Sequence, residues 1–318
     1  KIQNMSKVLV IIKSMGIGDL CILISNIHAI SKQISKPVSV LAQKNTRATE
    51  ILRHDPHIEE VIELDKKQIK GLFNIVKILK NKKFDQCYIF SDSIRFYLIS
   101  KLSNIKKIFH YKFFSKKQKN FFKTAKEFTE KTLNINVDPQ SKIYCQKTDI
   151  QSAKNNYNIT SDKKNYIIAP SASGPTKCWD INNYIKLLSE INNKFPSKFF
   201  IAGGQNDKIL IEKIMHSTIG KNCVSLSQKK IAEIIPIIAA CEYGIFNDTG
   251  FAHIASGLGI KCLVLFMDSP PAAYGIYSKK ISIIVPQGET IETCGHNTRG
   301  KDKISYDEVL SKSIKLAS

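Results

Sequence analysis

The sequence contains few arginines, one tryptophan and no closely spaced pair of cysteines. Four of its 48 basic residues are arginine, whereas a protein that reads nucleic acid would more often use the planar guanidinium fork. The eight scattered cysteines form no C-x-x-C pair, which argues against a zinc ribbon or a disulfide framework and suits a reducing compartment. No apolar run approaches the roughly 18–20 residues that span a bilayer. These absences predict a cytoplasmic protein and give no sign of a nucleic-acid partner.

The chain of 318 residues has a net charge of +21, almost all of it from lysine. This length exceeds the size at which a single core stops growing, so two domains are expected. The lysine excess has two explanations that composition alone does not separate. It attracts acidic partners or an anionic membrane surface, or it reflects an AT-rich genome.

Short apolar runs alternate with helical patterns along the first half of the chain. The expected strands of this half are residues 7–12, 38–42, 60–64, 84–90 and 105–111. Residues 20–34 carry one apolar helical stripe after the first strand, and residues 71–83 have the same character. Strands that alternate with helices predict a parallel sheet built from βαβ units.

The second half repeats this plan after a polar stretch, residues 146–164, that is typical of a linker. Its expected strands are residues 165–173, 198–204, 223–227, 243–247 and 261–266. Helices are expected at residues 180–195, 206–217, 229–241 and 305–317, and a short helix is expected to run from the strand 243–247 through residue 258. We therefore expect an α/β protein with two Rossmann-like, doubly wound domains, residues 1–150 and 151–304, that face each other across a cleft.

The stretch "FNDTGFAHIASGLG", residues 246–259, places Asp248, Thr249, Gly250 and His253 where a strand gives way to a helix. Backbone N–H groups at such a helix start, with small residues beside them, form an anion site to which a histidine adds a donor. The alternative is that Asp248 caps the helix and His253 is a packed core histidine.

Two further strand ends carry small residues together with polar or charged ones. "APSASGPTKCWD" contains Ser171, Ser173 and Lys177, and "AGGQND" ends at Asp207, which is placed to reach a ribose hydroxyl. Each motif alone also fits an ordinary turn with a solvated side chain. Because three successive strand ends meet at one edge of the sheet, together they predict a site for a nucleoside diphosphate.

The opening motif "KVLVIIKSMGIGDL" ends a strand in Gly16 and Gly18 and places Asp19 at the start of a helix. Asp19 is either an N-cap or a functional carboxylate that faces the cleft. The glycines let a ligand approach the backbone.

These motifs, in this order and spacing over nearly the whole chain, resemble glycosyltransferase family 9, the lipopolysaccharide heptosyltransferases of the GT-B fold. The resemblance rests on the G-x-G-D loop, the P-S-A-S…T-K-x-W segment and the N-D-T-G-x-x-H-I-A-S-G-L-G block. It implies a nucleotide-sugar donor, ADP-heptose by the family's habit, on the C-terminal domain. It also implies an acidic glycolipid acceptor of the lipopolysaccharide core on the N-terminal domain, and a terminal helix, residues 305–318, that packs back on that domain.

The resemblance further implies an inverting transfer in which Asp19 is the general base. Lys177 and the helix N–H groups would stabilise the leaving diphosphate, with no metal and no cofactor besides the donor. Three departures from the family pattern are the longer "SMGIGDL" loop, Asp180 after Trp179, and "MDSPPAAYG" at residues 267–275. They keep open a related transferase with another nucleotide sugar. A non-catalytic two-lobed protein that binds nucleotides or nucleic acid is the alternative from another class.

The segment from residue 101 to 131 is rich in lysine and aromatic residues. In one interpretation its lysines attract anionic lipid at the cytoplasmic face of the inner membrane while its aromatics enter the interface. In a second the aromatics stack on nucleic-acid bases. In a third the lysines are solvated and the aromatics lie in the core.

Overall fold

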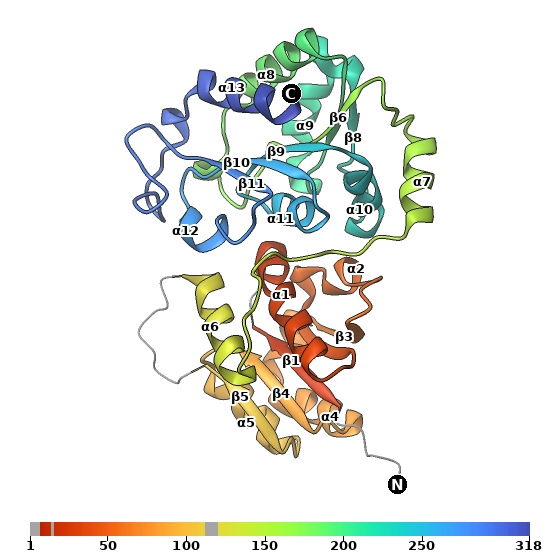
Figure 1. Ribbon diagram of the computed structural model, residues 1–318, viewed down its shortest axis with the longest axis vertical. Helices are drawn as coiled ribbons and strands as arrows, with labels where there is room; N and C mark the ends of the chain where they lie inside the picture. Colours follow the sequence, from red (N-terminus) through yellow and green to blue (C-terminus); the bar gives the residue numbers. More distant parts are fainter. Residues whose placement is uncertain (1–6, 14–15, 112–119) are drawn as a thin grey trace. The chain divides into compact units, whose positions relative to one another are not determined.

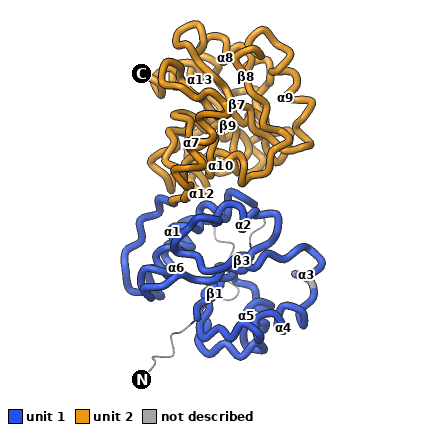
Figure 2. The backbone as a smooth tube through the Cα atoms, turned by 90° about the vertical axis from the view of Figure 1, so that its right-hand side faces the viewer, with its two compact units in different colours: residues 1–141 blue, residues 142–318 orange. Residues whose placement is uncertain are grey.

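The computed structural model describes residues 7–13, 16–111 and 120–318. The chain divides into two compact units, residues 1–141 and 142–318, coloured separately in Figure 2. The domain boundary expected at residue 150 falls inside helix α7, Lys147–Asn156, which packs on helix α10 of the second unit. The stretch interpreted as a linker therefore contains a helix, which its polar composition did not indicate.

The first unit is built on a five-stranded sheet with the strand order β3-β2-β1-β4-β5. All pairs are parallel, as the alternating pattern predicts. The strands are β1 Val8–Ile12, β2 Val38–Gln43, β3 Ile58–Leu64, β4 Gln86–Phe90 and β5 Lys107–His110. The helices are α1 Ile17–Gln33, α2 Ala48–Ile51, α3 Lys66–Lys70, α4 Leu72–Lys82, α5 Ile94–Leu102 and α6 Phe121–Leu133.

The second unit holds a six-stranded parallel sheet with the order β8-β7-β6-β9-β10-β11 (Figure 1). Its strands are β6 Lys164–Ala169, β7 Ser197–Ile201, β8 Cys223–Ser225, β9 Tyr243–Asn247, β10 Lys261–Leu265 and β11 Ile281–Ile284. Besides α7, its helices are α8 Ile181–Lys194, α9 Lys208–Met215, α10 Ile231–Ala240, α11 Gly250–Gly257, α12 Pro271–Tyr274 and α13 Tyr306–Ala317. All ten predicted strands are present, and β11 is an addition to them.

Both strand orders reverse direction once, and that point is where doubly wound sheets bind ligands. In the second unit the reversal lies between β6 and β9. Ala169 pairs with Phe246 at the last rung of this ladder, so the chain leaves both strands side by side. The loop after β6 and the start of α11 therefore meet at the carboxyl edge of the sheet.

Helix α13 packs on α8, β9 and β10 inside the second unit, where Figure 1 shows it beside α8. Its Val309 and Ala317 are buried in the core of that unit. The ring of Tyr306 stacks 6.0 Å from Trp179, which also makes an edge contact at 5.3 Å with Tyr184. These contacts engage the apolar stripe of the helix within its own unit, and the expectation that it packs back on the N-terminal domain stays a prediction.

The aromatic residues of segment 101–131 are packed wherever the structure describes them. Phe122 is buried, and the ring of Phe109 lies 4.8 Å from Tyr88. Tyr111 and Phe128 make an edge contact at 5.0 Å. This arrangement favours the core interpretation for these aromatics over insertion into lipid. Residues 112–119 of the segment, including Phe113 and Phe114, lie outside the described residues.

Within the described ranges, no helix is both long and apolar enough to cross a bilayer. All eight cysteines fall in those ranges, and each is a free thiol.

Candidate active site

A buried amide joins the two loops that leave the sheet of the second unit at its reversal point. Asn247 ends β9 with no exposed surface, and its Nδ2 donates to the carbonyl of Pro170 at 2.6 Å. Its Oδ1 accepts from the Tyr184 hydroxyl at 3.0 Å and from the Trp179 backbone N–H at 3.4 Å. One side chain therefore fixes the start and the end of the loop that carries Ser171, Ser173 and Lys177.

Asp248 is the centre of the charged groups at this edge. Its Oδ2 accepts from the Ser269 hydroxyl at 2.5 Å and lies 3.9 Å from the Lys177 ammonium. Its Oδ1 lies 3.7 Å from Nε2 of His253. Asp248 precedes the N-cap of α11, which is Thr249, so the simple capping interpretation of Asp248 is wrong.

The pKa of Asp248 shows the balance of these contacts. Burial is the largest single influence on its carboxyl and raises the pKa. The hydrogen bond and charge of His253 act in the opposite direction, Ser269 and Lys177 add to them, and the pKa falls below its ordinary value. The carboxylate is therefore ionised at neutral pH and holds both basic side chains beside the start of α11.

His253 lies on the first turn of α11 and is 4% exposed. Its Nδ1 is 3.0 Å from the Tyr277 hydroxyl, and the two rings stack. With Nε2 turned toward Asp248, both ring nitrogens face polar partners. The histidine is thus well packed, as the alternative interpretation expected, and it also belongs to the charged cluster.

Thr249 and Gly250 begin α11, and the backbone at Thr249 is extended. The first N–H groups of a helix have no partner within it, and the helix dipole makes this end favourable for an anion. Asp248, Lys177 and His253 surround this start, so an anion held there would meet two basic side chains.

Ser171 and Asp207 come from two different strand ends and are in contact. The Ser171 hydroxyl donates to Oδ2 of Asp207 at 2.9 Å, and the Gly204 N–H donates to the same oxygen at 2.7 Å. A side chain at Gly203 would press against Asp207 and Ile211, which explains the small residue there. Ser173 is exposed farther along its loop.

The loop after β10 adds residues that the sequence motifs did not indicate. Oδ2 of Asp268 accepts from the Thr176 hydroxyl at 2.6 Å, next to Lys177, and Oδ1 accepts from the Arg299 N–H at 2.9 Å. Asp268 and Ser269 belong to the stretch that departs from the family pattern. That stretch therefore supports the charged cluster directly, and its departure from the family pattern was the only signal in the sequence that pointed to it.

Asp19 lies in the first unit, in the first turn of α1, whose N-cap is Gly16. The N-cap interpretation of Asp19 is therefore wrong, although a carboxylate in the first turn still suits the helix dipole. A Cβ at position 16 would lie 3.4 Å from Oδ2 of Asp19, which is an ordinary van der Waals contact. Gly18 is the second residue of this helix.

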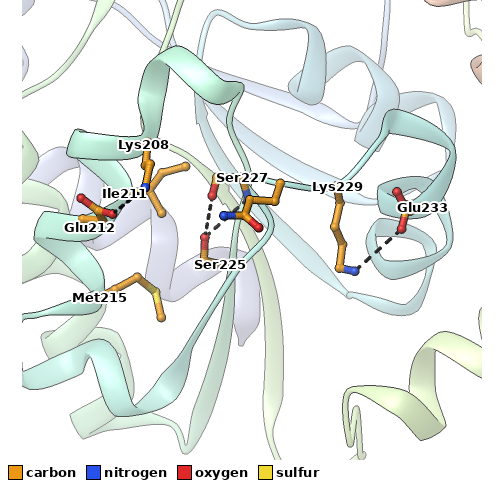
Figure 3. Close-up of a pocket in the computed structure, with 9 residues that line it drawn as sticks. Lys208, Ile211, Glu212, Met215, Ser225, Ser227, Lys229 and Glu233 are labelled. Carbon is orange, nitrogen blue, oxygen red and sulfur yellow. Dashed lines mark hydrogen bonds and ion pairs between the residues drawn. The ribbon is translucent and has the colours of Figure 1, made fainter.

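A pocket of about 550 Å³ lies along the edge strand β8, between α9 and the start of α10 (Figure 3). Its charged lining forms two ion pairs, Lys208 with Glu212 and Lys229 with Glu233. It begins one residue after Asp207 and includes none of the residues predicted to bind a donor. Among the described residues, no three His, Cys, Asp or Glu side chains are grouped so that they could hold a metal ion.

A family model described as glycosyltransferase family 9 (heptosyltransferase) matches residues 115–303, more than half of the chain. A search of curated proteins gave no match.

Solved structures similar to this chain include three of nearly equal length. E. coli ADP-heptose LPS heptosyltransferase II is 18% identical, with 98% of each chain covered and a TM-score of 0.75. The glycosyltransferase family 9 protein from Veillonella parvula is 15% identical, with 99% of each chain covered and a TM-score of 0.81. E. coli heptosyltransferase WaaC with ADP is 13% identical, covering 98% of this chain and 99% of the other, with a TM-score of 0.74. These similarities confirm the GT-B fold class.

We expect Asn247→Ala to lower the free energy of unfolding by about 3 kcal/mol, because three buried polar groups lose their partner. Urea denaturation measures this loss. Asn206→Ala, an exposed substitution in the loop after β7, is the control and should leave stability nearly unchanged. A variant at position 247 as stable as the wild type would contradict the bridging role.

The lowered pKa of Asp248 makes its contribution to stability dependent on pH. Because the folded pKa lies below the unfolded value, the contribution is complete at neutral pH and disappears as pH falls below about 4. Wild type should therefore exceed Asp248→Asn in stability at neutral pH, and the gap should close in acid. Urea denaturation across this range tests the expectation, and a gap independent of pH would refute it.

Proposed function

The chain belongs to glycosyltransferase family 9 (heptosyltransferase), and we propose that it transfers a heptose from ADP-heptose to a lipopolysaccharide-core or related glycolipid acceptor. The supporting observation is the cluster in which Asp248 holds Lys177 and His253 beside the start of α11. Two of the similar solved structures contain ADP or an ADP-heptose analogue. A diphosphate carries the charge that this cluster is suited to bind.

In this proposal the diphosphate is bound by Lys177, by His253 and by the first backbone N–H groups of α11, which follow Thr249 and Gly250. Asp248 is a positioning residue, since its carboxylate would repel phosphate oxygens but keeps the two basic groups in place. Ser171 orients Asp207, which receives a ribose hydroxyl, and Ser173 approaches the donor from its exposed loop. As the bond to the sugar breaks, the negative charge that grows on the leaving diphosphate is stabilised by these groups without a metal.

Asp19 is the proposed general base. An inverting transfer needs a carboxylate within about 2.6–3.2 Å of the acceptor hydroxyl, from which it takes the proton as the oxygen attacks the sugar. We propose that Gly16 and Gly18 let an acceptor approach the backbone beside this carboxylate. A glycolipid acceptor would also place the enzyme at the cytoplasmic face of the inner membrane as a peripheral protein.

A related transferase that uses another nucleotide sugar is the second candidate. Asp268 accepts hydrogen bonds at the edge of the cluster, in a loop that departs from the family pattern. A second carboxylate so close to the donor site can change which sugar or base is accepted. The binding experiment below separates the two candidates.

We expect ADP to raise the thermal unfolding midpoint, because a ligand at 100 times its dissociation constant adds about 2.7 kcal/mol to stability. UDP, GDP and CDP should give smaller shifts. Lys177→Ala should remove most of the ADP shift, whereas Lys261→Ala, an exposed lysine at the opposite end of β10, should retain it. A larger shift with UDP or GDP than with ADP would contradict ADP-heptose as the donor and favour another nucleotide sugar. The absence of a shift with any nucleotide would favour a non-catalytic protein.

Asp19→Asn should reduce turnover by about 10²–10⁴-fold, because the amide cannot accept the hydroxyl proton. The ADP-induced thermal shift should be unchanged, since the donor residues lie in the other unit. Release of ADP from ADP-heptose in the presence of a heptose-deficient lipopolysaccharide acceptor measures turnover. Glu50→Gln, a first-turn carboxylate on α2, is the matched control. Turnover that survives the change at Asp19 would refute its role.

A further inference from the structure

Helix α5 is apolar on two opposite sides. Phe96 and Ile99 are buried against the sheet, while Ile94, Leu98 and Leu102 are 44%, 47% and 49% exposed. Their spacing of four residues places the three exposed side chains in one row along the helix. An exposed row of large aliphatic side chains is unusual on a surface helix, which normally presents polar residues to water.

The neighbouring helix also exposes a large apolar side chain. Helices α4 and α5 pack side by side and cover the same face of the first unit's sheet (Figure 2). On α4, Phe73 is 83% exposed, the highest value among the large hydrophobic residues that the structure describes. Four of the six exposed large hydrophobics in the described ranges therefore lie on these two helices. We call their outer side the α4–α5 face.

The two helices of this face are also basic. Together α4 and α5 contain five lysines and arginines and no acidic residue, and one of the five, Lys82, forms an ion pair with Glu60 of β3. Lys77, Lys80 and Lys101 are exposed on the two helices. The first unit as a whole has 26 basic and 12 acidic residues, so it carries two thirds of the net charge of the chain.

We propose that the α4–α5 face is the surface through which this protein binds an anionic lipid bilayer. The aliphatic row and Phe73 enter the boundary between headgroups and acyl chains, and the surrounding lysines attract the lipid phosphates. A second copy of the same face is a poor occupant, because it would bring two strongly basic surfaces together. The occupant that complements both the charge and the exposed apolar side chains is anionic lipid.

The inference places membrane contact on α4 and α5, which share only Lys101 and Leu102 with the aromatic segment 101–131 that the sequence pattern had suggested. It rests on the proposed function only in that a glycolipid acceptor would give the enzyme a reason to bind a membrane. Its test needs neither the donor nor the acceptor. Failure of vesicle binding with an intact ADP-induced shift would therefore overturn this inference alone. Vesicle binding without an ADP-induced shift would overturn only the assignment of the donor.

The test is flotation of the full chain with lipid vesicles, comparing neutral phosphatidylcholine with a mixture containing about one third phosphatidylglycerol. We expect binding to the anionic vesicles that weakens as salt shortens the range of the charge attraction. The double variant Ile94→Ser/Leu98→Ser should bind at least about tenfold more weakly, because two apolar side chains no longer enter the interface. Its thermal midpoint should be unchanged, since both side chains are already exposed.

The matched control is Ile209→Ser, which removes an aliphatic side chain that is 74% exposed on the second unit. It should bind vesicles as the wild type does. Lys77→Gln/Lys101→Gln should weaken binding and reduce its dependence on salt. Equal binding by the double variant at 94 and 98, or equal binding to neutral and anionic vesicles, would overturn the proposal. So would self-association in sedimentation experiments that depends on Ile94 and Leu98 in the absence of vesicle binding.

Discussion

The arrangement of side chains around Asp248 depends on one buried amide, that of Asn247. Two of its three hydrogen bonds connect the end of β9 to both ends of the loop after β6, at the point where the strand order reverses, and the third comes from Tyr184 on α8. The polar atoms of a buried amide need hydrogen-bond partners. The loop must therefore adopt the conformation that places its backbone groups within reach of the Asn247 side chain. Because Asp248 is the next residue, this constraint also fixes the carboxylate that holds Lys177 and His253. The positions of these three charged side chains therefore depend on where the strands of the sheet end.

Much of the fold follows from hydrophobic periodicity, and the omissions have physical causes. The first ten strands are apolar runs between helical patterns, so their positions and parallel pairing were predictable. Helix α5 was not predicted, because apolar residues on two sides remove the one-sided periodicity that identifies a helix. Helix α7 resembled a linker because its buried surface consists of little more than Ala153. The packing of α13 on its own unit depends on tertiary contacts that a terminal helical pattern cannot specify.

The residues of the candidate site that follow the ends of β6, β7 and β9 were predictable from the sequence. Those in the loop after β10 were not predicted. Ser171 with Asp207 and Lys177 with Asp248 lie at strand ends, and the structure brings each pair together. Ser269 and Tyr277 were not predicted, because they belong to the loop after β10, whose sequence departs from the family pattern and suggested no binding residue. No local pattern encodes such a contact. The role of Asp19 stays a prediction from the family resemblance.

The position of Trp179 makes its fluorescence informative about the loop that carries Lys177. It is the only tryptophan of the chain, it follows Lys177 by two residues, and its indole is buried between Tyr184 and Tyr306. The emission of an indole changes with the polarity and rigidity of its surroundings. A single emitter in this position would report changes in the loop that carries Lys177, without interference from other tryptophans. In the proposed function this is the loop whose lysine receives the diphosphate.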